Sequence, residues 1–174
     1  MIYKVGIIGA GLIGLKRAKN IVTSAKIVAI CDISKSRINN FCKQFNKKNL
    51  IIYQNWKELL NNDDIDVVII STPHNHLIKI ASESLKKNKH VFVEKPGARN
   101  YRELENLKSK ITKKDEKKIK FGFNHRFHSS FLLLKKLIKE KKIGRLMYGR
   151  GFYGHGARIG YEKEWRMQPK ISGG

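Results

Sequence analysis

Hydrophobic residues in the first 123 positions come in short runs that Gly, Asn, Ser or Pro interrupt. The run Asp66–Ile70 is continuously apolar after its first residue and stops at Pro73, as expected for a central strand of a sheet covered on both faces. We expect strands at about 2–8, 26–31, 50–53, 66–70, 90–93 and 119–123.

Segments with helical spacing of apolar residues lie between these strands. Asn55 and Asn100 each precede such a segment and have a Glu three residues later, which is typical of a helix N-terminus. The alternation predicts an α/β fold with a parallel sheet, in a first domain of residues 1–123. Residues 124–174 are expected to begin a second domain, with a helix at about 130–142 and a strand at 146–152. The other helices are expected at about 12–23, 34–45 and 74–87.

The first predicted strand leads into Gly9-Ala10-Gly11-Leu12-Ile13-Gly14 and then into a helix. Gly9 allows a tight turn, Gly11 lets a pyrophosphate approach the backbone, and Gly14 lets the helix pack closely against the strand. The first helical turn, with Leu12 and Ile13, then points its N–H groups at the anion. The sequence therefore predicts a Rossmann doubly wound parallel sheet that binds a dinucleotide.

Asp32 ends the second predicted strand, about twenty residues beyond the glycines. A carboxylate there accepts hydrogen bonds from the adenosine ribose and repels the extra phosphate of NADP, so Asp32 favours NAD. Ser34, Lys35 and Arg37 follow and are able to bind a 2′-phosphate, which leaves NADP open. The structural alternative is that Asp32 only caps the helix that starts near Ser34.

The 174 residues include 37 Lys and Arg against 14 Asp and Glu, a formal net charge of +23. Such a charge suggests nucleic acid as a partner, and a basic nucleic-acid-binding protein on a Rossmann scaffold is one alternative. The lysines are, however, spread over helix ends and loops without an aromatic stacking platform, so we expect no specific nucleic acid. The two cysteines have no C-x-x-C spacing, and neither a signal peptide nor an apolar run of membrane-spanning length is evident, which predicts a cytoplasmic protein without membrane contact.

Ligands of such sheets bind at the carboxyl ends of the strands. The residues at these ends are therefore the candidates for chemistry. A histidine pair at positions 74 and 76 has no third convergent ligand in the sequence, so no metal is expected. Besides the glycine loop and Asp32, the candidates are Ser71, Thr72, Pro73, His76, Glu94, Lys95, Asn124 and Arg126.

The motifs GAGLIG, STPHNHL, VFVEKP, GFNHRF and GYEKEWRMQPKISGG occur in an order and spacing that resemble the Gfo/Idh/MocA family of sugar and inositol dehydrogenases. The resemblance implies NAD(P)-dependent hydride transfer from a secondary hydroxyl of a sugar, nucleotide-sugar or cyclitol. It implies that Lys95 lies beside the nicotinamide as the catalytic residue, oriented by Glu94. An ammonium group there stabilises the alkoxide that forms as hydride leaves.

The resemblance also implies a set of cofactor contacts: Ser71, Thr72, Pro73 and His76 near the nicotinamide, Asn124 and Arg126 at the start of the second domain, and Trp165 and Arg166 in a covering loop. In relatives the open sheet of the second domain forms dimer interfaces, so a homo-oligomer is one expectation. Relatives continue into a D-x-x-x-H motif that carries the general-base histidine, and none follows the tail here. The alternative to a dehydrogenase is therefore a truncated dinucleotide-binding module with little or no turnover.

Overall fold

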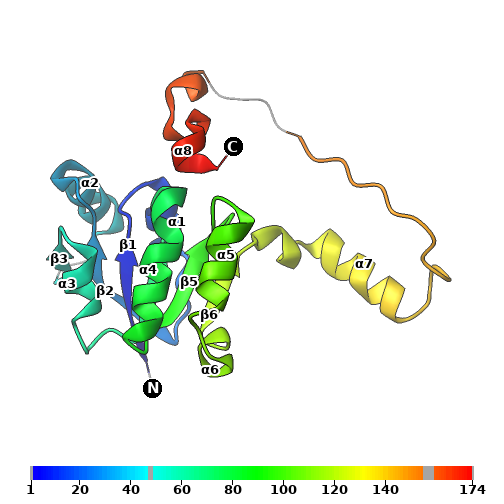
Figure 1. Ribbon diagram of the computed structural model, residues 1–174, viewed down its shortest axis with the longest axis horizontal. Helices are drawn as coiled ribbons and strands as arrows, with labels where there is room; N and C mark the ends of the chain where they lie inside the picture. Colours follow the sequence, from blue (N-terminus) through cyan, green and yellow to red (C-terminus); the bar gives the residue numbers. More distant parts are fainter. Residues whose placement is uncertain (1, 47–48, 155–158, 174) are drawn as a thin grey trace. The chain divides into compact units, whose positions relative to one another are not determined.

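The computed structural model describes residues 2–46, 49–154 and 159–173. Six strands form one sheet in the order β3-β2-β1-β4-β5-β6, and every neighbouring pair is parallel (Figure 1). This order confirms the predicted Rossmann fold. The chain first adds β2 and β3 on one side of β1, then returns and adds β4, β5 and β6 on the other side, so the strand order reverses between β1 and β4. The strands are β1 (Tyr3–Ile8), β2 (Ala25–Cys31), β3 (Ile51–Tyr53), β4 (Val67–Ile70), β5 (His90–Glu94) and β6 (Ile119–Gly122).

Helices follow the strands much as the sequence predicts. The side chain of Asn55 accepts a hydrogen bond from the backbone N–H of Lys57, and that of Asn100 accepts one from Glu103, so both predicted caps are confirmed. A short helix from Lys113 was not predicted, although Thr112 and Asp115 form its capping box. The helices are α1 (Leu12–Lys19), α2 (Lys35–Phe45), α3 (Trp56–Leu60), α4 (His74–Lys86), α5 (Tyr101–Lys108) and α6 (Lys113–Glu116).

Both faces of the sheet are covered by apolar side chains, because neighbouring strand residues point in opposite directions. On β4, Ile69 packs into one cluster with Leu15 of α1 and Phe41 of α2. Ile70 points the other way, into a second cluster that includes Leu77 of α4. Each fully buried side chain of this size contributes about 1.5–3 kcal/mol, so the two clusters fix the strand ends that carry the candidate residues.

The chain divides into two compact units, Met1–Gly122 with Trp165–Gly174, and Phe123–Glu164. The sequence interpretation placed everything after residue 123 in a second domain. Residues 165–173 belong instead to the first unit, because their backbone contacts Arg99 and His74. They contain the short helices η3 (Trp165–Met167) and α8 (Pro169–Ser172).

The second unit contains η1 (Asn124–Phe127), α7 (Ser129–Lys139) and η2 (Tyr161–Lys163). The strand predicted at 146–152 is wrong, since these residues have no regular secondary structure. A strand needs a hydrogen-bonding partner, and the described part of this unit offers none. Apolar side chains on α7, such as Phe131 and Leu133, are correspondingly exposed.

Candidate functional site

The three glycines of the loop between β1 and α1 have different surroundings. Gly9 has a φ of +105°, and a Cβ there would lie 2.7 Å from the backbone of Ser71. A Cβ on Gly14 would lie 2.0 Å from the carbonyl oxygen of Gly9. A Cβ on Gly11, in contrast, would meet no described protein atom within 4 Å. The fold thus requires Gly9 and Gly14, whereas the space at Gly11 is open to a group from outside.

Ser71, at the end of β4, holds this loop in place. Its hydroxyl donates a hydrogen bond of 2.9 Å to the carbonyl oxygen of Gly9, and its backbone N–H donates to Ile8. Gly11 is the N-cap of α1 and has no side chain to accept hydrogen bonds from the first helical turn. The N–H groups of Leu12 and Ile13 are therefore available to an anion, which the helix dipole also favours.

Asp32 at the end of β2 is tied to the same loop. Its Oδ2 accepts a hydrogen bond of 2.9 Å from the N–H of Ala10, and its Oδ1 accepts one of 2.9 Å from Ser34. Ser34 is the N-cap of α2, so the alternative in which Asp32 caps that helix is wrong. Each carboxylate oxygen keeps a further lone pair for a ribose hydroxyl. The guanidinium of Arg37, itself largely exposed, lies 4.0 Å from Asp32 Oδ1.

Two large apolar side chains flank this part of the site. Leu12, from the predicted set, is 73% exposed, and Ile33, which directly follows Asp32, is 84% exposed. The sequence interpretation did not include Ile33. The available signal was an apolar residue at a strand end between two polar ones, a position where an adenine ring finds an apolar surface.

The end of β4 and the start of α4 supply the next predicted residues. Ser71, Thr72 and Pro73 are half-buried, and the hydroxyl of Thr72 donates to the carbonyl oxygen of Pro73. His76, in the first turn of α4, is exposed. Because β4 lies beside β1 in the sheet, these residues follow the glycine loop along the same carboxyl edge.

Glu94 and Lys95 lie at the end of β5, one strand further along. Lys95 is exposed, whereas Glu94 is 8% exposed. The Glu94 carboxylate forms an ion pair with Arg17 of α1, and the Arg17 guanidinium lies 5.1 Å from the centre of the Phe92 ring. The direct partner of Glu94 is thus on the coenzyme-binding helix predicted from the glycines. Sequence reasoning missed Arg17, because the pair joins residues that are 77 positions apart.

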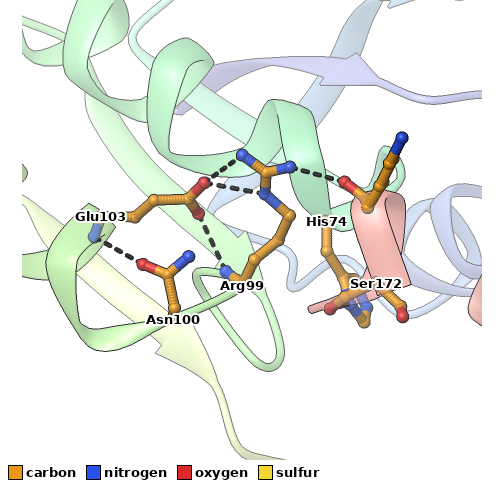
Figure 2. A network of polar contacts seen from close by, with 6 residues as sticks. His74, Arg99, Asn100, Glu103 and Ser172 are labelled. Carbon is orange, nitrogen blue, oxygen red and sulfur yellow. Dashed lines mark hydrogen bonds and ion pairs between the residues drawn. The ribbon is translucent and has the colours of Figure 1, made fainter. Parts of the chain in front are cut away.

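Residues 165–173 lie against the start of α4. The Trp165 ring meets the His74 ring edge-on at 4.7 Å between centres, and the Arg166 guanidinium lies 4.6 Å from the Trp165 ring centre. His74 Nδ1 lies 2.9 Å from the carbonyl oxygen of Ser172 (Figure 2). Burial lowers the pKa of His74, the hydrogen bond to Ser172 raises it in part, and the positive charges of Lys95 and Arg166 lower it again, with a net lowering. The first unit therefore brings Trp165 into contact with His74, whose ring also lies within electrostatic range of Lys95 and Arg166.

Asn124 and Arg126 belong to the second unit, where the Arg126 guanidinium lies 5.4 Å from the Phe123 ring centre. Their contribution to the site stays a prediction. Within residues 2–46, 49–154 and 159–173, no group of three or more His, Cys, Asp or Glu side chains is arranged to hold a metal ion. No helix in these ranges has the length and apolar character needed to cross a membrane.

The family model described as "oxidoreductase family, NAD-binding Rossmann fold" matches residues 3–123. Inositol 2-dehydrogenase of Salmonella paratyphi B is 30% identical over 159 residues, 87% of this chain and 46% of that protein. A glycosyl hydrolase family 109 protein of Shewanella is 28% identical and aligns with 96% of this chain and 37% of its own length. The crystal structure of Lactobacillus casei myo-inositol dehydrogenase with NAD(H) and myo-inositol has a TM-score of 0.76 at 29% identity, over 83% of this chain and 43% of that chain.

The chain spans less than half of the length of each of these relatives. The matched residues 3–123 include the glycine loop, Asp32, the β4 end and Lys95. The chain therefore belongs to the Gfo/Idh/MocA family of oxidoreductases with an NAD-binding Rossmann fold.

Proposed function

We propose that this chain is the coenzyme-binding part of an NAD-dependent dehydrogenase. The observation that carries the proposal is the contrast among the glycines, with Gly9 and Gly14 enclosed by protein and Gly11 facing open space. The first-turn N–H groups of α1 bind the coenzyme pyrophosphate, and Asp32 accepts hydrogen bonds from the adenosine ribose. The adenine lies against the exposed side chain of Ile33.

The chemistry of the proposed enzyme takes place at the end of β5. NAD, when bound, accepts a hydride from carbon. Lys95 is exposed beside the β4 end, and its ammonium group binds the substrate hydroxyl and stabilises the negative charge that grows on the oxygen. Thr72, Pro73 and His76 line the nicotinamide side, and Trp165 and Arg166 cover it.

The substrate class that we propose is a polyol with a secondary hydroxyl, such as a cyclitol or a sugar. Two relatives are named inositol dehydrogenases, and one was solved with myo-inositol bound. Asn124 and Arg126 stay predicted cofactor contacts. A homo-oligomeric assembly and a cytoplasmic location stay predictions from the sequence.

Binding is tested by titrating the chain with NADH and following energy transfer from its two tryptophans. We expect saturable binding in the range of roughly 1 μM to 1 mM, which is typical of such coenzymes and substrates. Gly11→Val is the matched variant, because the Cβ of the new side chain enters the proposed phosphate space without meeting protein. Equal binding by parent and variant would contradict the assignment of the phosphate site to Gly11. No binding by the parent would contradict the proposal and leave the nucleic-acid alternative.

Activity is tested by screening inositols and sugars for NADH formation, with Lys95→Ala as the control. We expect turnover to fall by about 100-fold or more in the variant, because positioned acid–base groups contribute ~10²–10⁴-fold. NADH binding without any turnover would favour the alternative of a dinucleotide-binding module. The screen includes nitrophenyl glycosides, since one relative is named a glycosyl hydrolase. Nitrophenol release without net NADH formation would identify a hydrolase and contradict the proposed reaction.

A further inference from the structure

A network of polar contacts joins the loop after Lys95 to the last residues of the first unit (Figure 2). Arg99, four residues beyond Lys95, is at its centre. Its Nη1 donates a hydrogen bond of 2.5 Å to the backbone carbonyl of Lys170. Its Nε and Nη2 donate to Glu103 Oε1 at 2.7 and 2.5 Å. One planar guanidinium thus binds the carboxylate on one side and the returning chain on the other.

Glu103 fixes the direction in which Arg99 points. The second oxygen of Glu103 accepts a hydrogen bond of 2.9 Å from the backbone N–H of Arg99, so the residue is held at both backbone and side chain. The Glu103 N–H is itself capped by Asn100. Because Asn100 already caps α5, the ion pair is not needed to start the helix. The ion pair between Arg99 and Glu103 instead orients the Arg99 guanidinium towards the carbonyl of Lys170.

The returning chain also touches Arg99 through its backbone. Gly173 has a φ of +95°, and a Cβ there would lie 2.3 Å from the carbonyl oxygen of Arg99. The preceding residue, Ser172, is 6% exposed, and its carbonyl oxygen lies 2.9 Å from His74 Nδ1. Since a carbonyl only accepts, Nδ1 carries the proton of this hydrogen bond. The segment 168–173 is therefore fastened at two elements, the loop before α5 and the start of α4.

We propose that Arg99 and Glu103 form a clamp whose role is to hold residues 165–173 as a wall of the coenzyme crevice. The clamp positions Trp165 against His74, and Arg166 stacks on Trp165. Arg99 is a positioning residue in this inference and makes no contact with coenzyme or substrate. The coenzyme role of the clamp rests on the proposed function, whereas the clamp itself rests on the contacts above.

Three variants of the chain test the clamp. Arg99→Met removes the hydrogen bonds and keeps much of the side-chain volume. Gly173→Ala leaves every charge in place but collides with the Arg99 backbone. Arg102→Met is the matched control, because Arg102 is an exposed arginine in the first turn of α5, the helix that carries Glu103. Each variant is studied by hydrogen exchange, by NADH titration and by urea unfolding of the whole chain.

In Arg99→Met and Gly173→Ala, we expect the amides of residues 168–173 to exchange about tenfold faster or more, the size expected for losing a charge-assisted hydrogen bond. Exchange in β1 and β4 stays unchanged, and NADH affinity falls several-fold. The control behaves as the parent. Unchanged exchange at 168–173 in both variants would overturn the clamp.

Faster exchange at 168–173 with an unchanged NADH affinity would overturn the role of the clamp at the coenzyme site. A loss of NADH affinity that only follows a general loss of stability, with faster exchange in β1 and β4 as well, would also overturn that role. If the parent fails to bind NADH, the proposed function fails with the coenzyme role of the clamp. The exchange experiment still decides whether the clamp exists, so the two failures are distinguishable.

Discussion

At the scale of single residues, the glycines of the loop have different roles: Gly9 and Gly14 are needed for folding, and Gly11 is expected to be needed for binding. Gly11→Ala introduces a methyl group into open space, so we expect a free energy of unfolding within about 1 kcal/mol of the parent. The same variant should bind NADH about tenfold more weakly or worse, because the pyrophosphate is held away from the N–H groups. Urea unfolding and NADH titration measure the two effects.

Gly14→Ala is the matched control, since its methyl group would lie 2.0 Å from the carbonyl oxygen of Gly9. We expect this variant to lose about 1–3 kcal/mol of stability, as overpacked sites do. Equal stability losses in the two variants would mean that Gly11 has a structural role and that the space beside it is not reserved for a ligand.

Cys31 lies next to Asp32, and its buried position changes the acidity of its thiol. Burial raises the pKa of the Cys31 thiol to about 12, with a contribution from the Asp32 charge. At pH 8 only about one thiol in ten thousand is then the reactive thiolate. We expect a thiol reagent to modify one of the two cysteines in the native chain, the half-buried Cys42, and both after denaturation. Rapid modification of Cys31, located by mass spectrometry, would contradict the buried environment.

At the scale of elements, the ion pair between Arg17 and Glu94 ties α1 to the end of β5. The side chains of Arg17 and Glu94 are 28% and 11% exposed, so removing one of them leaves the charge of the other largely buried and unpaired. We expect Arg17→Met to lower the free energy of unfolding by about 2 kcal/mol, and Arg17→Met with Glu94→Gln to lose less than the sum of the single variants. Urea unfolding of the four proteins gives the coupling energy.

The exposed pair between Lys86 and Glu83 on α4 provides the comparison. Glu83→Gln should change stability by no more than about 0.5 kcal/mol, as is usual for surface pairs. Additive effects of the Arg17 and Glu94 substitutions would show that the two side chains do not depend on each other, against the contact described above.

The contact between α4 and residues 165–173 should depend on pH through His74. Burial lowers the pKa of His74 below its ordinary 6.5, the hydrogen bond to the Ser172 carbonyl partly offsets this, and the charges of Lys95 and Arg166 lower it further, so that the net shift is downward. The undocked imidazole therefore binds a proton more readily than the docked one. As the pH falls below about 6.5, docking weakens, because the undocked state takes up protons.

We expect hydrogen exchange at residues 165–173, corrected for the intrinsic rate, to become faster between pH 7.5 and pH 5.5 in the parent. His74→Gln should lose this dependence. His76→Gln, which changes an exposed histidine of the same helix, should keep it. A pH dependence that survives in His74→Gln would assign it to another group.

Local patterns were sufficient to predict most elements and the glycine loop, because strand periodicity, helix caps and the glycine spacing act over a few residues. The Asn55 and Asn100 caps are examples. Contacts between distant segments were not predictable: the Arg17 pair spans 77 positions and the Arg99 bond to Lys170 spans 71. The prediction of a strand at 146–152 was wrong for the same reason, since a strand depends on a hydrogen-bonding partner that no local pattern reveals.

At the scale of the whole molecule, the first unit contains the family match and almost all the candidate residues. The net charge of +23 attracts anions in general, including the coenzyme, and does not by itself identify a nucleic-acid partner. Specific recognition depends on the local contacts at the carboxyl edge of the sheet. The proposed function therefore depends on where the coenzyme binds within the first unit.

A crystal structure of the chain soaked with NADH tests this most directly. We expect the pyrophosphate at the N–H groups of the glycine loop, the adenosine ribose on the Asp32 carboxylate, and the nicotinamide within contact distance of the Lys95 ammonium. Coenzyme bound elsewhere, or a nicotinamide ring turned away from Lys95, would contradict the account.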